Sequence, residues 1–249
     1  LTYTCVASAN IQCSIDSANI TFTPAPNFNG VEVLTLGVQD PSGEEDTQDV
    51  TVTVNSVNDA PVLDAIDDVD FDEDETTIIT ASGTDIDGDD LTYTCVASVN
   101  IACNVVGDEI TLIPDDDWHG EQSVTIGVQD PSGESDTQEV VATVNPINDP
   151  PEIDPIDNFS FIEGESAVKI AVGSDVDGDV LSYSCTSSDN IDCSVGNTNE
   201  ITFSADDDWN GGPETLTITV DDGQGEDNSQ TSTTVDVTVN PSNDPPELA

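Results

Sequence analysis

The chain has 249 residues with 53 acidic side chains, a single basic side chain (Lys169) and a formal net charge of −52. This charge excludes nucleic acid as a partner, because nucleic-acid binding requires a basic surface, and it excludes attraction to anionic membranes. The apolar residues fall in short alternating runs, so no membrane insertion is expected in this segment.

One sequence unit of about 90 residues recurs along the chain. Leu1-Thr-Tyr-Thr-Cys5 returns at 91–95, and returns as Leu-Ser-Tyr-Ser-Cys at 181–185. Such a period predicts tandem modules that contact their neighbours in the chain. The expected domains are the C-terminal part of a repeat (1–57), two complete repeats (58–147 and 148–242) and the start of a further repeat (243–249). Because position 1 falls inside a repeat, we expect a window from a longer, exported polypeptide.

The complete repeat 58–147 predicts seven short strands separated by turn residues. In chain order they cover 61–71 with a break, 76–81, 91–98, 101–106, 109–113, 123–129 and 137–145. Side chains alternate between apolar and polar within these runs, as in half-buried strands, and no helical periodicity is present. The pattern predicts an all-β chain of tandem antiparallel β-sandwich domains of immunoglobulin-like architecture.

Six cysteines form three pairs with identical spacing. They are Cys5 and Cys13, Cys95 and Cys103, and Cys185 and Cys193. Two thiolates do not complete a zinc site, so we predict one short disulfide in each repeat. Disulfides persist in oxidising compartments and place the chain outside the cytosol.

Two tryptophans occupy matched positions, Trp118 and Trp209, each followed two residues later by a glycine. Carbohydrate stacking is one interpretation of these rings. Each repeat supplies only one ring, which favours a core anchor beneath a turn.

Acidic residues concentrate in one repeated motif. Asp85-Ile-Asp-Gly-Asp89 returns as Asp175-Val-Asp-Gly-Asp179. Alternating carboxylates around a glycine turn suit Ca²⁺, which binds six to eight oxygen ligands, whereas Mg²⁺ prefers to keep its waters. An EF-hand would need Gly at its sixth position and Glu at its twelfth, where this chain has Asp90 and Val96, so an EF-hand is rejected.

Alternating strand direction predicts which acids meet. The entering linker and the loops at 82–90 and 130–136 should share one end of a domain, and the loops at 72–75 and 114–119 should share the other end with the exit linker. We therefore expect several Ca²⁺ ions at the interdomain joints, and fewer at the first joint because its loop at 26–27 carries no acid. The first joint comprises Asn58, Asp59, Asp85, Asp87, Asp89 and Asp130. The second comprises Glu73, Glu75, Asp115, Asp116, Asp117, Asn148, Asp149, Asp175, Asp177, Asp179 and Asp222.

Several ordered motifs resemble a known family. The linker motifs at 58–61 and 148–151, the acidic motif at 72–75 and the two Asp-x-Asp-Gly-Asp loops resemble the bacterial cadherin-like tandem repeats of large extracellular adhesins and surface fibres. The resemblance implies calcium at the domain junctions and a cell-surface or secreted protein. The chain departs from animal cadherins at Ser56, Pro146 and Pro241, where their linkers have an aspartate.

The sequence predicts no enzyme. His119 is the only histidine, and neither a Ser-His-Asp grouping nor a Cys-His pair can be assembled. We expect a structural segment of a calcium-stiffened adhesin stalk or surface fibre, arranged as an extended rod. Its partners would be neighbouring repeats of the same chain and identical chains in a fibre. The alternatives are a subunit of a self-assembling filament and a glycan-binding accessory module of a secreted enzyme.

Overall fold

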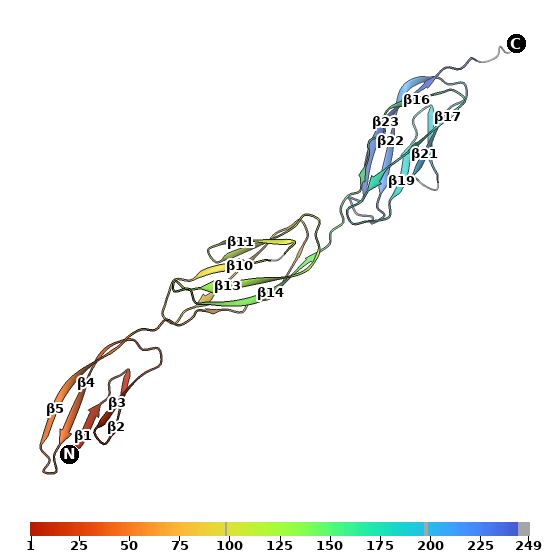
Figure 1. Ribbon diagram of the computed structural model, residues 1–249. Helices are drawn as coiled ribbons and strands as arrows, with labels where there is room; N and C mark the ends of the chain where they lie inside the picture. Colours follow the sequence, from red (N-terminus) through yellow and green to blue (C-terminus); the bar gives the residue numbers. More distant parts are fainter. Residues whose placement is uncertain (98, 197–198, 244–249) are drawn as a thin grey trace. The chain divides into compact units, whose positions relative to one another are not determined.

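The computed structural model describes residues 1–97, 99–196 and 199–243 of the chain. All regular elements in these residues are β-strands, so the chain is all-β as predicted (Figure 1). The described part contains no helix of the length and apolar character needed to cross a membrane. Residues 244–249, which hold most of the expected start of a further repeat, lie outside the described residues, as does Ser98 at the end of a predicted strand.

The chain divides into two compact units, Leu1–Val144 and Asn145–Ala249. Unit 1 therefore contains both the first and the second repeat. The domain boundaries expected from the sequence, and the expected rod arrangement, stay predictions.

The first repeat in unit 1 has two small sheets. One has the order β1-β4-β5 and the other pairs β2 with β3, and all of these pairs are antiparallel. The strands are β1 (Thr2–Val6), β2 (Ile11–Asp16), β3 (Asn19–Pro24), β4 (Gly30–Gln39) and β5 (Glu45–Val54).

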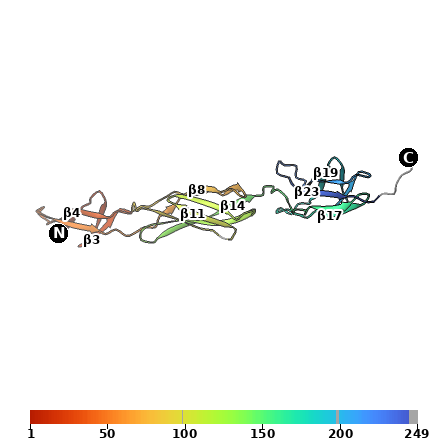
Figure 2. The ribbon, with the colours of Figure 1, turned by 90° about the horizontal axis from the view of Figure 1, so that it is seen from above.

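The second repeat is a fuller sandwich. Its two layers have the orders β10-β13-β14-β7 and β11-β12-β8, and β6 pairs with β9. Figure 2 shows β11 and β14, which belong to the two different layers. The strands are β6 (Val62–Leu63), β7 (Val69–Asp72), β8 (Thr77–Thr80), β9 (Gly83–Thr84), β10 (Thr92–Val96), β11 (Ile101–Val106), β12 (Glu109–Pro114), β13 (Gly120–Gln129) and β14 (Ser135–Asn145).

Unit 2 repeats the same plan. Its layers have the orders β16-β23-β22-β19 and β17-β21-β20, and β15 pairs with β18. Strand β16 runs parallel to β23, whereas the pairs β17–β21, β19–β22, β20–β21 and β22–β23 are antiparallel. The strands are β15 (Glu152–Ile153), β16 (Phe159–Ile162), β17 (Ser166–Ile170), β18 (Gly173–Ser174), β19 (Ser182–Thr186), β20 (Ile191–Val195), β21 (Glu200–Ala205), β22 (Gly211–Asp221) and β23 (Gln230–Asn240).

The strand boundaries differ from the prediction in small ways. The predicted strand at 61–71 is observed as β6 and β7, and β13 and β14 begin a few residues earlier than expected. Strand β9 was not predicted, because two residues are too few to show alternation. Its Gly83 lets the backbones approach closely, since a Cβ there would lie 2.8 Å from the Val62 carbonyl oxygen.

Alternating side chains build one apolar core in the second repeat and another in unit 2. Ile110, Leu112 and Ile126 come from both layers of the second repeat and are fully buried. Trp118 and Trp209 pack against these two cores, which confirms the predicted anchor role.

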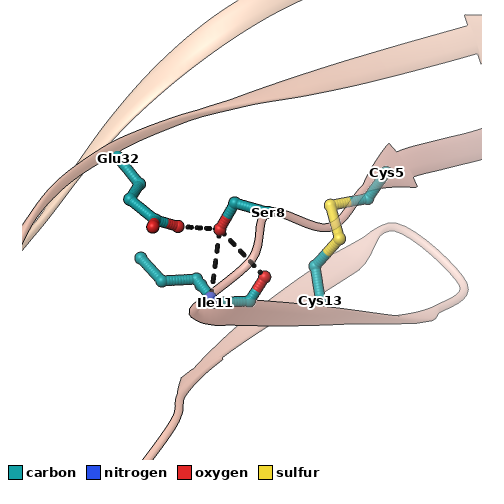
Figure 3. The surroundings of a disulfide bond; sticks show 5 residues. All are labelled: Cys5, Ser8, Ile11, Cys13 and Glu32. Carbon is teal, nitrogen blue, oxygen red and sulfur yellow. Dashed lines mark hydrogen bonds between the residues drawn. A yellow bond between two sulfur atoms is a disulfide. The ribbon is translucent and has the colours of Figure 1, made fainter. Parts of the chain in front are cut away.

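Each cysteine pair forms a disulfide between the two layers of its repeat. Cys5 in β1 is bonded to Cys13 in β2 (Figure 3), and the other two predicted pairs are bonded in the same way. The Cα atoms are 6.2–6.3 Å apart. By the chain-entropy model, closing a loop this short stabilises the folded state by about 2–3 kcal/mol.

A glutamate accepts hydrogen bonds from the loop that lies between the two bonded cysteines. In the first repeat, Glu32 accepts hydrogen bonds from the Ser8 hydroxyl and, at 2.7 Å, from Asn10 Nδ2 (Figure 3 shows Ser8 and Glu32). In unit 2, Glu214 accepts hydrogen bonds from the Ser188 hydroxyl and from the Asn190 backbone N–H at 3.1 Å. The serine hydrogen bond is the largest cause that lowers the pKa of each glutamate.

We predict that Glu214→Gln lowers the thermal midpoint of unit 2 at neutral pH. A carboxylate with a lowered folded pKa stabilises the folded state above its unfolded pKa of about 4.3, and this contribution is lost as the pH falls through the folded pKa. The difference between variant and wild type should therefore vanish in acid. Calorimetry from about pH 7 down to about pH 3 measures it.

Glu200→Gln in β21 is the matched control, because Glu200 lies in the same unit and its side chain accepts no hydrogen bond from the described residues. A deficit for Glu214→Gln that persists unchanged in acid would contradict the account.

Candidate metal centre

In unit 1, the loop between β9 and β10 folds around its own first aspartate. Asp85 Oδ1 accepts hydrogen bonds from the backbone N–H of Asp87 at 2.8 Å and of Asp89 at 3.5 Å. Gly88 has φ of 79°, a left-handed conformation that glycine adopts without strain. The turn therefore gathers the carboxylates of the loop at one place.

Three carboxylates converge at this loop. Asp85, Asp89 and Asp130 each offer an oxygen within 4.8 Å of the others. Asp130, in the loop between β13 and β14, is 4% exposed. Asp85 Oδ2 is buried and accepts no hydrogen bond from the described residues. A buried carboxylate oxygen that lacks a donor and faces like charges is costly, unless a cation binds it.

The pKa values of this cluster move in opposite directions. Burial raises the pKa of Asp89, and the negative charges of Asp85 and Asp130 raise it further. The pKa of Asp130 is lowered, chiefly by the hydrogen bond from the Asn58 side chain. In the absence of a cation, the cluster thus keeps Asp130 ionised and opposes ionisation of Asp89.

The linker that enters the second repeat meets both loops. Asn58 Nδ2 donates to Asp130 Oδ2 at 2.7 Å, and Asn58 Oδ1 accepts from the Ser132 hydroxyl at 2.9 Å. The Asp59 backbone N–H donates to Asp87 Oδ2 at 2.8 Å. The residues expected at the first joint therefore lie at one end of the second repeat, as alternating strand direction requires.

Unit 2 contains a related cluster. Asp175, Asp177 and Asp179 offer oxygens within 4.8 Å of one another, and Asp175 Oδ2 is buried with no donor among the described residues. The two clusters differ in their third member. In the second repeat the third carboxylate is Asp130, from the loop between β13 and β14, whereas in unit 2 it is Asp177, from the same loop as Asp175 and Asp179.

The linker that enters unit 2 makes the same two contacts. Asn148 Nδ2 donates to Asp222 Oδ2 at 3.0 Å, and the Asp149 backbone N–H donates to Asp177 Oδ2 at 2.8 Å. Burial opposes ionisation of Asp222, but hydrogen bonds from the Gln224 backbone and from Asn148 outweigh it and lower the pKa.

The other end of the second repeat carries the remaining predicted residues of unit 1. Glu73 is 1% exposed and its Oε2 lies 3.3 Å from His119 Nδ1, a contact that the sequence did not predict. The Asp117 backbone N–H donates to Asp74 Oδ1 at 3.4 Å. Glu75 is exposed, and so are Asp115 and Asp116. Whether this set joins the predicted residues of unit 2 stays a prediction.

Sequence reasoning missed several polar residues around these clusters. Ser132 and Glu134 bind Asn58, Gln224 Nε2 donates to Asp179 Oδ2 at 2.6 Å, and Asn228 Nδ2 donates to the Asn148 carbonyl oxygen. One signal was present, because the sequence Gln-Asp-Pro-Ser-Gly-Glu occurs at 39–44 and again at 129–134.

The comparisons with known proteins agree with this architecture. A family model described as "Bacterial Ig domain" matches residues 1–53, 58–143 and 148–240. The chain belongs to the bacterial Ig domain family. A comparison with curated protein sequences gives no match.

Several of the similar solved structures are cadherin ectodomains. A structure titled "Protocadherin gammaB7 EC3-6 cis-dimer structure" has a TM-score of 0.57 at 16% identity and covers 96% of this chain and 64% of its own. Protocadherin Gamma B2 extracellular cadherin domains 1-5 has a TM-score of 0.55 at 15% identity, with coverage of 98% and 53%. Drosophila N-cadherin EC1-4 has a TM-score of 0.50 at 14% identity, with coverage of 96% and 66%.

This chain thus spans about half to two thirds of the length of those structures. At such identities the likeness shows the fold alone. It agrees with the predicted resemblance to bacterial cadherin-like tandem repeats.

We predict that Asn58→Ala raises the pKa of Asp130 in metal-free protein, because the hydrogen bond from Asn58 is the largest cause that lowers it. Asn148→Ala should raise the pKa of Asp222 by less, because the hydrogen bond from the Gln224 backbone N–H remains and lowers this pKa more than the hydrogen bond from Asn148 does. Carboxyl-carbon NMR titration measures both values. An unchanged pKa of Asp130, or a larger rise at Asp222, would show that the linker asparagine does not control the cluster.

Proposed function

We propose that the chain is a calcium-binding structural segment of an extracellular stalk or surface fibre. One observation carries the proposal. In each unit a buried carboxylate oxygen without a donor, Asp85 Oδ2 or Asp175 Oδ2, lies in a cluster of three carboxylates. Folding would be opposed at both places unless positive charge is supplied from outside the chain.

The donor set fits Ca²⁺. All the gathered ligand atoms are carboxylate oxygens, and Ca²⁺ takes six to eight oxygens in flexible geometry, whereas Mg²⁺ demands a strict octahedron. The six cysteines are held in disulfides and offer no thiolate to a softer metal. Asp85, Asp89 and Asp130 would hold the ion in unit 1, and Asp175, Asp177 and Asp179 would hold it in unit 2. The ion would supply the positive charge.

The linkers give calcium a mechanical role. Asn58 and Asn148 tie each linker to a loop that belongs to, or adjoins, a carboxylate cluster. A bound ion would therefore restrict the linker as well as the loops. Pro61, Pro150 and Pro151 already limit the linker backbone. We infer that calcium stiffens the joints between repeats, with Glu73, Glu75 and Asp117 adding ligands at the second joint.

The remaining features support a structural role outside the cell. Three disulfides suit an oxidising compartment. The single histidine lies beside Glu73, which is buried. The partners would be neighbouring repeats and, in a fibre, identical chains.

Thermal unfolding tests the calcium proposal. Each site that is saturated about a hundredfold above its Kd stabilises the folded state by about 2.7 kcal/mol, so calcium should raise the midpoint by at least about 5 °C. The comparison is calcium against chelator, with disulfides intact and with sodium chloride at equal ionic strength.

The double variant Asp85→Asn and Asp175→Asn is the control. It should lose most of the calcium-dependent rise, because it replaces the two carboxylates that carry the buried oxygens. A rise that sodium reproduces in full would mean that the acids form only a salt-screened surface.

A further inference from the structure

Lys169, the only base of the chain, lies on the inner face of an edge strand in unit 2. Strand β17 pairs with β21 alone in the described residues, so its other edge is free. Along β17, the half-buried side chains of Ala167 and Lys169 alternate with those of Val168 and Ile170, which are 55% and 59% exposed. The ammonium group therefore lies on the side of the strand that faces the sandwich interior, and the apolar side chains face solvent.

The backbone N–H groups of Val168 and Ile170 point to the free edge. The Ala171 N–H donates to the Asn199 carbonyl oxygen at 2.9 Å, on the side of β21. Successive N–H groups of a strand point to opposite sides, so those of Val168 and Ile170 point away from β21. An unpaired edge of this kind can pair with a strand of another chain.

The segment around Lys169 differs in composition from the rest of this acidic chain. Residues 166–174 contain no acidic side chain, although Glu165 and Asp175 flank them. Apart from Lys169, every residue from 167 to 172 is apolar, and three of them are Val or Ile. Six or seven such residues without charge or proline are typical of segments that pair between chains. Lys169 is thus the one charge that interrupts a pairing-prone segment.

The corresponding edge of the second repeat carries no charge. Strand β8 has Ile79, which is 6% exposed, at the position of Lys169. On its outer face Ile78 is followed by Thr80, so a hydroxyl interrupts the apolar run that Val168 and Ile170 form in β17. The charge therefore occurs in the repeat whose edge strand has the more apolar outer face.

The ring of Phe159 explains why this charge is a base. Lys169 Nζ lies 4.4 Å from the centroid of that ring, which belongs to β16 in the other layer. The face of an aromatic ring is negative, so it attracts an ammonium and would repel a carboxylate. The second repeat has Val69 and Ile79 at these two positions, and so lacks both the ring and the ammonium. Lys169 forms no ion pair with the described residues, although the chain has 53 acids.

A second copy of the chain is the partner whose charge and pattern fit this edge. The same segment of that copy brings no carboxylate with it, whereas most of the chain would. Two copies of β17 can pair antiparallel about a two-fold axis, and the register that places Val168 opposite Ile170 uses the free backbone groups of both residues. This register also places the two Lys169 side chains directly opposite each other. Like charges at opposed positions disfavour pairing, and so does the removal of water from both ammonium groups.

We propose that Lys169 prevents the free edge of β17 from pairing with the same edge of a second copy of the chain. An inward-pointing charge on an edge strand is one of the devices by which proteins block such pairing. Contacts between identical chains in a fibre would then use other surfaces. The inference goes beyond the proposed function and does not depend on calcium.

Sedimentation velocity of the complete 249-residue chain over a range of concentrations, in buffer that contains calcium, tests the proposal. Lys169→Ile should strengthen self-association at least about tenfold over the wild type, because apolar contacts replace two opposed ammonium groups. Hydrogen exchange of this variant should show new protection at the N–H groups of Val168 and Ile170 as its concentration rises.

Two further variants separate edge pairing from unfolding. Adding Ile170→Pro to Lys169→Ile removes a backbone donor from the free edge and should return self-association to the wild-type level. Lys169→Glu keeps a charge at this position but loses the attraction of the ring, so it should lower the thermal midpoint of unit 2 without increasing self-association. A cooperative thermal transition checks that unit 2 is folded in each variant.

Three results would each overturn the proposal. They are equal self-association of the wild type and Lys169→Ile, association of Lys169→Ile that persists when Ile170→Pro is added, and stronger association of Lys169→Glu than of the wild type.

Discussion

Repulsion between carboxylates that the fold itself brings together is the constraint on which the rest of this structure depends. Alternating strand direction places the loop that begins at Asp85 beside the loop that begins at Asp130, and the disulfides and apolar cores hold each sandwich in that form. The disulfides and the cores oppose separation of the two loops, so the repulsion remains in the folded state. A bound cation or a proton would relieve it, and mobile ions would screen it in part.

The hydrogen-bonded partners of each cluster work against protonation. Asn58 and the backbone N–H groups of the loop hold the pKa of Asp130 low, while Asp89 has its pKa raised by burial and by its neighbours. One carboxylate thus stays ionised and another is left in an unfavourable place for its charge. A bound divalent cation would resolve both conditions at once, and this is why we connect the local electrostatics with the linkers.

The strand pattern and the disulfide pairs could be predicted from the sequence, because each depends on short-range spacing that a regular repeat displays three times. The meeting of Asp85 with Asp130 could be predicted too, since it follows from strand direction alone. The partners of the linker asparagines could not. Ser132 and Asn228 contact residues more than 70 positions away, and such contacts depend on register and on side-chain rotamers.

The second repeat shows a second limit of sequence reasoning. Gln138 looks like an ordinary surface residue of a strand in the sequence. Only the hydrogen bonds between Gln138 and Ile66 show that this glutamine holds another segment. The pairing of His119 with the buried Glu73 is likewise a result of tertiary packing and has no counterpart in local pattern.

The central claim is that the buried oxygens of Asp85 and Asp175 mark cation sites. Equilibrium dialysis with radioactive calcium measures this most directly, by counting the ions bound to the wild type and to the Asp85→Ala, Asp175→Ala double variant. The account predicts saturable binding of several ions to the wild type and a lower count for the variant. An equal count for both proteins, or no saturable binding to the wild type, would contradict it.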